Sequence, residues 1–543
     1  KLHSSCFDFI VCGAGSAGSV IANRLTEIKN ATVLLIEAGG DPPVESVIPG
    51  LFLYMKNTSV DWNYKTEDDG YSQQFHKNYG AELTRGKMLG GSSSINFLLY
   101  TRGNPHDFDG WANITGDDSW NWKSTLPYFK KSERLVDPIL LEYDAGKYHG
   151  TDGYLGTTRN YNKEVLKYFE AFKEAGHKIV LDIHGDSPLG YTEGMLTIAH
   201  HLRQSTAQSF LHPIKNRPNL FVLKNTLVSK IIFAIGVEAI LKNNKTVYFK
   251  AKKEVIVSAG AINTPQLLML SGVGPKKHLL SHNITVISNL PVGQTLQDHI
   301  LLNLILTMGP SVSSKPVDPT NIAFPLITGY VSLNKSQDYP DYQTLSFVMN
   351  EPTGALQFCA FYYSFIDELC NSLYEGSTGK SVLFSSVVLL HPESRGNILL
   401  RSTNPKEQPL IYTGYYSNDE DLEKHATYLQ DFLKVQDTEF FKCVRSELVV
   451  PEICGCGEMN LTLKYWKCYT LCLMSPGYHY AASCPMGVVV DSRLNVLGVQ
   501  RLRIVDASVM PTITSANTNA ATIMIAERAA DFIKEVHYCD VQT

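Results

Sequence analysis

The sequence predicts an α/β fold around a parallel sheet, with a second domain packed beside it. Three observations carry this prediction. An apolar strand pattern near the N-terminus, Phe7 to Val11, runs into a glycine-rich turn and then into a helical pattern. A second strand-turn-helix pattern begins at Glu254. The length of 543 residues exceeds what one hydrophobic core usually supports, so we expect two domains.

The first strand, turn and helix form a candidate dinucleotide site. Gly13 permits a tight turn, Gly15 lets phosphates approach the backbone, and Gly18 allows the helix to pack closely on the strand. Ser16 and Ala17 open a helix whose N-terminus can accept a pyrophosphate. A glycine-rich turn in another kind of α/β protein remains the alternative at this point.

An acidic residue at the end of the second strand strengthens the dinucleotide prediction. The apolar strand Thr32 to Ile36 ends in Glu37 and Ala38, where a carboxylate can bond an adenosine ribose. An acid at this position disfavours a 2′-phosphate. We therefore expect FAD or NAD rather than NADP.

Residues 86–96 are too rich in glycine and serine for an ordinary helix or strand. A ligand that approaches this backbone closely would explain the composition. A flexible linker is the alternative, although Leu89 and Ile95 interrupt the run with apolar side chains.

Residues 258–265 follow the strand Glu254 to Val257 and are also small. We expect Pro265 to start a helix that ends before Gly272, because proline favours the first turn and glycine follows the last. By these local rules the segment is a strand-turn-helix unit that packs near a ligand. The alternative is that its glycines are needed only for the turns.

In this order and spacing, these segments resemble the signature segments of the glucose-methanol-choline oxidoreductase family. The resemblance continues through Val292 to His299, where Thr295 replaces the usual asparagine. It extends through Tyr478 to Gly487 and through Val505 to Asn519, so it spans nearly the whole chain. Arthropod members are the most similar in these last segments.

The resemblance implies two discontinuous domains. A Rossmann-like FAD-binding domain would comprise residues 1–105, 200–305 and 485–543. A substrate-binding domain with an antiparallel sheet covered by helices would comprise residues 106–199 and 306–484.

The resemblance also implies which residues hold FAD. Asn96 stands where members with a covalently attached flavin carry histidine, so the FAD is expected to be non-covalent. The implied cofactor-binding residues are Gly13, Gly15, Ser16, Ala17, Gly18, Glu37, Ala38, Arg85, Leu89, Gly90, Ser92, Asn96, Val228, Ser258, Ala259, Gly260, Asp506, Ala507, Asn517, Thr518 and Asn519.

Two residues are candidates for catalysis. Oxidation of an alcohol by hydride transfer needs a base for the hydroxyl proton. His479 lies in a non-periodic segment and matches the catalytic histidine of the family, and Asn517 matches a second position that is histidine or asparagine. Because an amide is no base, we expect His479 to be the sole base and Asn517 to orient the substrate. A structural histidine is the alternative.

Composition excludes some partners and favours one compartment. The net charge of −5 leaves no basic stripe for nucleic acid, and no apolar run approaches the roughly 18 residues of a membrane span. The chain starts at Lys1, which is typical of a mature form after removal of a signal peptide, and a truncated chain is the alternative. Seven sequons add to the expectation of a secreted protein with N-linked glycans: Asn30, Asn57, Asn113, Asn244, Asn283, Asn334 and Asn460.

Five of the eleven cysteines fall within thirty residues. We expect one or two disulfides among them, with the pairing left open. They are Cys443, Cys454, Cys456, Cys468 and Cys472. Their spacing does not match zinc ligands, so we expect no metal.

These observations favour a secreted FAD-dependent oxidase or dehydrogenase that takes hydride from an alcohol or a cyanohydrin. The resemblance to arthropod members implies a small aromatic substrate such as mandelonitrile, with oxygen as acceptor giving hydrogen peroxide, and a quinone as the alternative acceptor. The other functions that stay open are a hydroxynitrile lyase on the same scaffold, a glucose dehydrogenase using a quinone, a non-catalytic flavin carrier and an NAD enzyme.

Overall fold

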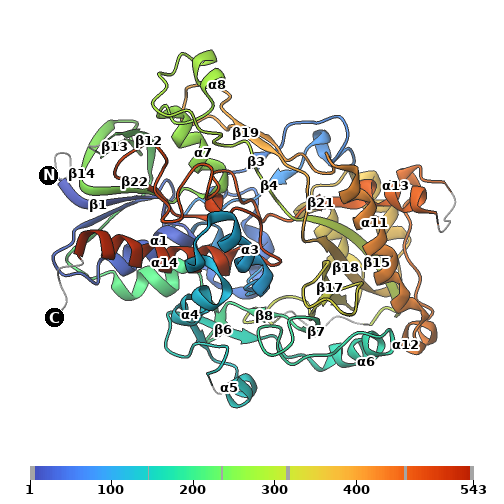
Figure 1. Ribbon diagram of the computed structural model, residues 1–543. Helices are drawn as coiled ribbons and strands as arrows, with labels where there is room; N and C mark the ends of the chain where they lie inside the picture. Colours follow the sequence, from blue (N-terminus) through green and yellow to red (C-terminus); the bar gives the residue numbers. More distant parts are fainter. Residues whose placement is uncertain (1–5, 145, 234–235, 313–317, 458–461, 539–543) are drawn as a thin grey trace.

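The computed structural model describes residues 6–144, 146–233, 236–312, 318–457 and 462–538. Two sheets lie side by side, the first near both chain termini and the second near helices α11 (Asp419–Leu433) and α13 (Leu463–Leu473) (Figure 1). Each sheet belongs to its own large hydrophobic core. The fold is therefore an α/β unit joined to a second sheet-based unit.

The first sheet combines parallel strands with an antiparallel edge. Its strands are β1 (Cys6–Cys12), β2 (Val33–Ile36), β11 (Leu220–Leu223), β12 (Thr226–Ile232), β13 (Gly236–Leu241), β14 (Thr246–Val257) and β22 (Leu502–Ile504). The strand order is β11-β2-β1-β14-β13-β12, and β22 pairs with β14. β1 pairs in parallel with both neighbours, and its apolar run is fully buried, as expected for a strand covered on both faces. This confirms the Rossmann-type sheet.

Helices α1 (Ser16–Leu25) and α14 (Asn519–Tyr538) lie side by side against this sheet (Figure 1). Arg24 of α1 joins Glu527 of α14 through two hydrogen bonds, of 2.7 and 2.8 Å. Because this ion pair is buried, it fixes the two helices relative to each other. The N-termini of both helices point toward the same edge of the sheet, at the carboxyl end of β1.

The expected start of the next helix is wrong. α7 (Gly260–Leu270) begins five residues before Pro265, which lies inside it. A distant carboxylate caps the earlier start, since Asp506 Oδ2 accepts the N–H of Gly260 at 2.9 Å and the hydroxyl of Thr264 at 2.6 Å. A local pattern cannot reveal a cap that comes from the far end of the chain.

The second sheet is antiparallel throughout, which confirms that expectation. Its strands are β7 (Gly190–Glu193), β15 (Ile300–Pro310), β16 (Leu326–Val331), β17 (Tyr342–Met349), β18 (Lys380–Leu389) and β21 (Met474–Pro476), in the order β21-β15-β18-β17-β16-β7. β21 pairs with the first residues of β15. This pairing brings the loop after β21 beside the residues that precede β15.

The division into domains at the expected boundaries stays a prediction. The boundary at residue 305 falls inside β15, all of which belongs to the second sheet.

Shorter elements surround the two sheets. The other helices are α2 (Val44–Val47), α3 (Pro105–Thr115), α4 (Trp122–Ser132), α5 (Pro138–Asp144), α6 (Leu166–Glu174), α8 (Lys276–Ser281), α9 (Thr353–Leu356), α10 (Asp367–Glu375) and α12 (Glu439–Cys443). The other strands are β3 (Tyr64–Lys65), β4 (Glu82–Leu83), β5 (Glu133–Leu135), β6 (Leu155–Arg159), β8 (Met195–Leu196), β9 (Ile198–Ala199), β10 (Leu202–Arg203), β19 (Asn397–Leu399) and β20 (Leu410–Tyr412).

Two disulfides occur in the cysteine-rich segment, as expected there. They join Cys454 to Cys472 and Cys456 to Cys468, while Cys443 is free. A third disulfide, between Cys359 and Cys370, was not predicted, because its two cysteines are spaced like ordinary core residues.

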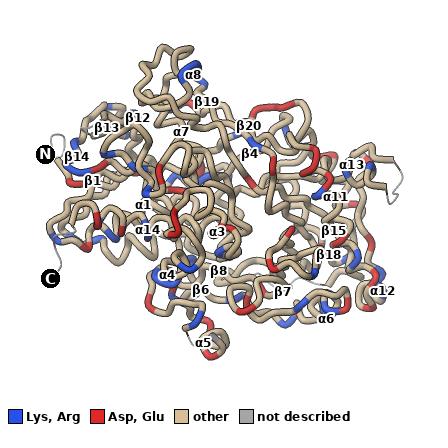
Figure 2. The backbone as a smooth tube through the Cα atoms, viewed as in Figure 1, with Lys and Arg blue, Asp and Glu red and all other residues tan. Residues whose placement is uncertain are grey.

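The surface carries both signs of charge. Lys and Arg are interspersed with Asp and Glu over both halves of the molecule (Figure 2). Six of the seven sequon asparagines are exposed, and Asn460 lies outside the described residues. Among the helices that the structure describes, none is long and apolar enough to cross a membrane.

Candidate active site

A cleft lies between the two sheets and is lined by residues of both. Its open mouth included, the cleft encloses about 1980 Å³ of space that no protein atom fills, and its lining extends from Glu37 at the end of β2 to Phe347 of the second sheet. The walls include the β1–α1 turn, the N-termini of α7 and α14, and the loop that follows β21. The cleft therefore has room for a dinucleotide and a second molecule.

The glycines of the β1–α1 turn allow backbone segments to touch. A Cβ on Gly13 would lie 2.4 Å from the carbonyl oxygen of Ser258, and one on Gly18 would lie 1.9 Å from that of Gly13. A Cβ on Gly91 would lie 2.7 Å from the Cα of Gly15. The small residues of segment 86–96 thus let this segment pack directly on the dinucleotide turn, which is why it is neither a linker nor a regular helix.

Glu37 lies at the end of β2, where its carboxylate lines the cleft. Oε2 accepts the N–H of Ala14 at 2.9 Å, and Oε1 accepts the N–H of Gly39 at 2.8 Å. Burial raises the pKa of this carboxyl, against the hydrogen bonds that it accepts. The side chain is held rigidly where an adenosine ribose is expected.

Most of the predicted cofactor residues come together along this cleft. Those that line it are Gly13, Gly15, Ser16, Ala17, Glu37, Ala38, Arg85, Ser92, Asn96, Val228, Ser258, Ala259, Gly260, Asp506, Ala507, Asn517, Thr518 and Asn519. Gly18, Leu89 and Gly90 do not line it. Gly18 packs against the turn, and the N–H groups of Leu89 and Gly90 donate to the carbonyls of Gly40 and Ala14, so these three shape the wall from behind.

Sequence reasoning missed several lining residues, such as Trp62 and Thr84. Each reaches the cleft from a loop that only the tertiary fold places there. No local pattern distinguishes them from other buried residues.

His479 projects into the cleft from the loop after β21. Its Nε2 lies 2.9 Å from Nδ2 of Asn517, and its Nδ1 lies 2.8 Å from Nδ1 of His299. Burial and, secondly, the charge of Arg85 lower the pKa of His479 to about 3. The imidazole is therefore neutral at physiological pH, with one ring nitrogen free of a proton.

The hydrogen bonds around Asn517 identify that nitrogen. Thr101 Oγ1 donates to Asn517 Oδ1 at 3.1 Å and accepts the backbone N–H of Asn517 at 3.0 Å. The amide nitrogen of Asn517 consequently faces Nε2 of His479 and donates to it. The lone pair of His479 thus lies on Nε2, at the point in the cleft where the two predicted catalytic residues meet.

A carboxylate behind the loop fixes its backbone. Asp298 Oδ1 accepts the N–H of His479 at 2.6 Å, and Oδ2 accepts the N–H of Gly477 at 3.2 Å. The hydroxyl of Tyr415 donates to Oδ2 at 2.6 Å. Burial raises the pKa of Asp298 to about 7 in spite of these donors. Asp298 and His299 stand in a recognisable segment of the sequence, but nothing there indicates their contact with His479.

The end of the cleft beside the second sheet is neutral. Apolar and aromatic side chains dominate it, with hydroxyls as the polar groups. The lining residues from this part are Phe97, Leu99, Leu301, Leu345, Phe347, Tyr362, Tyr363, Ser386 and Tyr478. Glu37 and Asp506 are not among them, and Arg85 only borders this end, where its Nη1 donates to the carbonyl of Tyr478, so this end suits an uncharged molecule.

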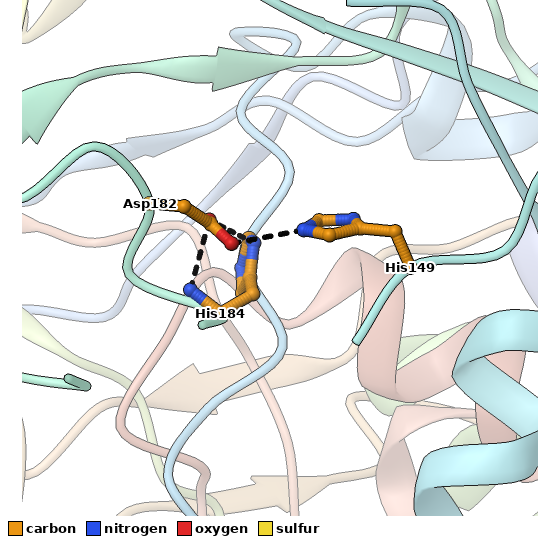
Figure 3. Close-up of side chains that lie close together, drawn as sticks. All are labelled: His149, Asp182 and His184. Carbon is orange, nitrogen blue, oxygen red and sulfur yellow. Dashed lines mark hydrogen bonds and ion pairs between the residues drawn. The ribbon is translucent and has the colours of Figure 1, made fainter. Parts of the chain in front are cut away.

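A second cluster of titratable groups, His149, Asp182 and His184, is buried away from the cleft (Figure 3). His149 Nε2 lies 3.0 Å from Asp182, and its Nδ1 lies 2.9 Å from Glu133, which also pairs with Arg102. Burial disfavours charge on His149, but the hydrogen bonds to Asp182 and Glu133 outweigh it and raise the pKa to about 9. Two positive and two negative groups then balance, so we interpret the cluster as an ion network. The absence of a metal remains a prediction.

Family models match most of the chain. The N-terminal model of the GMC oxidoreductases matches residues 7–301, and the C-terminal model matches residues 392–526. The chain belongs to the GMC oxidoreductase family. The expected membership in the glucose-methanol-choline family is thereby confirmed, and with it FAD as the cofactor and oxidation of CH–OH groups as the class of reaction.

Similar proteins include insect enzymes. Ecdysone oxidase of Bombyx mori is 39% identical over 99% of this chain and 83% of its own length. Glucose dehydrogenase [FAD, quinone] of Drosophila pseudoobscura pseudoobscura is 34% identical over 97% of this chain and 87% of its own length. A formate oxidase structure from Aspergillus oryzae superposes with a TM-score of 0.84 at 27% identity, covering 98% of this GMC chain and 99% of that one.

The residues in the cleft fit FAD. The hydroxyls of Ser258 and Thr84 are buried in its wall without a hydrogen-bond partner among the described residues, so a polar ligand would satisfy them. Ser16 Oγ donates to Asn519 Oδ1 at 2.7 Å, which joins the N-termini of α1 and α14 at the cleft. Both helices direct their positive ends there, as a pyrophosphate requires.

Proposed function

We propose that this GMC oxidoreductase oxidises a bulky, uncharged alcohol, with His479 as the base and Asn517 as the group that orients the substrate. The observation that carries the proposal is the convergence of His479 Nε2 and Asn517 Nδ2, 2.9 Å apart, in the wall of the cleft. A hydroxyl oxygen that lies on the cleft side of the pair, within hydrogen-bond distance of both atoms, would give its proton to Nε2 and accept a hydrogen bond from Nδ2.

The chemistry of the two side chains, His479 and Asn517, gives them different roles. FAD, when bound, supplies the hydride acceptor. His479 Nε2 takes the hydroxyl proton as the carbonyl forms, and the amide of Asn517 donates to the same oxygen, where negative charge develops. The neighbouring Arg85, whose Nη1 donates to the carbonyl of Tyr478 at 2.9 Å, holds the loop that carries the base.

The neutral end of the cleft supports an alcohol of the ecdysone type over a sugar. A steroid presents a large apolar surface, which suits Leu301, Leu345 and Phe347, whereas glucose would place hydroxyls on almost every carbon against these apolar side chains. The name of the 39%-identical relative agrees with this choice. The names of the relatives above give no support to a cyanohydrin such as mandelonitrile or to a hydroxynitrile lyase.

Several finer features belong to the same proposal. The acceptor is oxygen, giving hydrogen peroxide, and a quinone is the alternative that the 34%-identical relative suggests. FAD is non-covalent, because the lining residue Asn96 stands where members with a covalently attached flavin carry histidine. The protein is secreted and glycosylated, as the six exposed sequons and three disulfides favour.

Anaerobic mixing tests the proposal. Purified protein is mixed with ecdysone, glucose, an aryl alcohol and mandelonitrile while the flavin absorbance is recorded, in the wild type and in His479→Ala. Bleaching by ecdysone that the substitution slows by about 100-fold or more supports the proposal. Bleaching by glucose alone overturns the substrate class, and equal bleaching of both proteins overturns the role of His479.

A further inference from the structure

We infer that His299 is a positioning residue that keeps the proton of His479 on Nδ1 and thereby leaves Nε2 unprotonated, as a base must be. The inference rests on the proposed function, because it matters only if His479 takes the substrate proton. His299 itself does not line the cleft. It acts through its neighbour.

The contact between the two imidazoles is direct. Their Nδ1 atoms lie 2.8 Å apart, their ring centroids lie 5.0 Å apart, and the rings cross at 80°. Two neutral imidazoles in this arrangement share one proton, so one Nδ1 carries a hydrogen and the other accepts it. A hydrogen on both nitrogens would place two donors face to face.

The orientation of the Asn517 amide determines which of the two rings carries the proton between the Nδ1 atoms. Its amide nitrogen faces Nε2 of His479, because its oxygen is taken by Thr101. Nε2 is therefore the acceptor, and the one hydrogen of the neutral His479 ring lies on Nδ1. His299 Nδ1 must accept it.

Burial keeps His299 in the accepting form. The side chain has no exposed surface, and desolvation, together with the nearby His479, lowers its pKa well below the usual range. His299 thus stays neutral and keeps its lone pair toward His479. When His479 has taken a proton and both of its nitrogens carry hydrogens, the same contact becomes a charge-assisted hydrogen bond.

Backbone contacts between the two segments hold the rings of His299 and His479 close together. The N–H of Gly477 donates to the carbonyl of His299 at 2.8 Å, and a Cβ at residue 477 would lie 2.7 Å from that oxygen. Only glycine lets the loop approach so closely. These main-chain contacts therefore fix the position of His299, and its ring contacts His479.

The test compares His299→Phe, which fills the space without an acceptor, with His299→Asn, whose side-chain oxygen can take the place of Nδ1. The rate of anaerobic flavin reduction is measured with the alcohol of the panel above that reduces the wild-type flavin fastest. His425→Phe is the matched control, since His425 is equally buried but contacts Tyr416 and Val387 rather than the site. The flavin content and melting temperature of each variant are recorded.

We expect His299→Phe to slow flavin reduction by about 100-fold at saturating substrate, the lower end of a general-base contribution. The substrate concentration for half saturation should not change, and the solvent deuterium isotope effect should rise, because proton transfer becomes the slow step. His299→Asn should stay within about tenfold of the wild type, since the acceptor is retained. If His299→Phe fails to hold flavin, His299→Ala gives the same comparison.

Three results overturn the inference. They are a normal rate in the Phe and Ala variants, an equal loss in the Asn variant, and a loss with no change in the solvent isotope effect, which would mean general disruption. A normal rate in His479→Ala would instead overturn the proposed function, so the two failures are distinguishable.

Discussion

The carboxylate of Asp298 accepts the backbone N–H of His479 at 2.6 Å, so the loop that carries the proposed base is anchored by a buried acid. The same carboxylate accepts the hydroxyl of Tyr415 and the N–H of Gly477. Each of these bonds needs an oxygen lone pair, and protonation of Asp298 would remove one of them. The geometry of the site therefore depends on the charge of this group.

We predict that flavin reduction slows as the pH falls through about 7, the value to which burial raises the pKa of Asp298. Below that pH the acid is protonated and the His479 loop loses an acceptor. Asp298→Asn keeps one acceptor at every pH, so it should give a lower rate without this inflection. Stopped-flow reduction between pH 5.5 and 9 measures both profiles, and an unchanged inflection in the variant would contradict the prediction.

The raised pKa of Asp298 also makes the free energy of unfolding depend on pH. The folded protein binds the Asp298 proton more tightly than the unfolded chain, whose aspartates titrate near about 4. The free energy of unfolding therefore falls as the pH rises from about 4 to about 7. Denaturant titrations of wild type and Asp298→Asn at these two pH values isolate this contribution.

Glu37→Ala should weaken FAD binding by about 10- to 100-fold, the worth of a hydrogen bond to a charged group. The N–H groups of Ala14 and Gly39 hold the carboxylate at the position where the ribose is expected. Glu37→Gln loses the charge but keeps an acceptor, so we expect a smaller effect. Release of flavin on dilution, followed by its fluorescence, gives the affinities, and equal affinity in all three proteins would exclude a role in binding.

Gly13→Ala should abolish flavin binding or folding, because its Cβ would lie 2.4 Å from the carbonyl oxygen of Ser258. Gly379→Ala is the control. Gly379 also has a positive φ, of 75°, but no described atom lies within 4 Å of the position that its Cβ would take, so its replacement tests backbone strain without a clash. Flavin content per protein is the measurement, and comparable content in both variants would show that the close approach is unimportant.

The sequence predicted the elements that local chemistry determines. The strand before Gly13, the helix after it and the C-terminal helix from Asn519 follow from apolar periodicity and glycine placement, and all three occur. The start of α7 was misplaced, because Asp506, which caps it, comes from the far end of the chain. Contacts of that range leave no local pattern.

The residues of the candidate site could be named from the sequence, but the contacts among them could not. His479 and Asn517 could be named from motif positions, and they do meet. The contacts of Asp298 and His299 with the His479 loop depend on the pairing of β21 with β15, which brings residues 180 positions apart together. The neutral end of the cleft likewise gathers side chains from several strands of one sheet, so its character appears only in the folded chain.

His149→Phe should destabilise the fold by about 3–5 kcal/mol, since it leaves two buried carboxylates short of a partner. In the wild type, the pKa of His149 is raised to about 9, so its contribution is fully present below about 6.5 and is lost as the pH rises through 9. The variant should show a flatter decline over this range. His425→Phe is the control, because burial lowers the pKa of His425 to about 4, outside the window. Melting temperatures between pH 6 and 10, with and without a chelator, test both the sign and the absence of a metal.

Asn517→Asp should slow flavin reduction by about 100-fold, the cost of losing one donor at an oxygen that becomes negative. The change is isosteric, but a carboxylate cannot donate to the substrate oxygen, and it would draw a proton onto Nε2 of His479, 2.9 Å from the present amide nitrogen. Both effects disable the base. Asn517→His keeps a donor and should retain activity within about tenfold. Anaerobic stopped-flow reduction of flavin-saturated protein measures the three rates, and an Asp variant as fast as the wild type would show that Asn517 neither orients the substrate nor sets the protonation of His479.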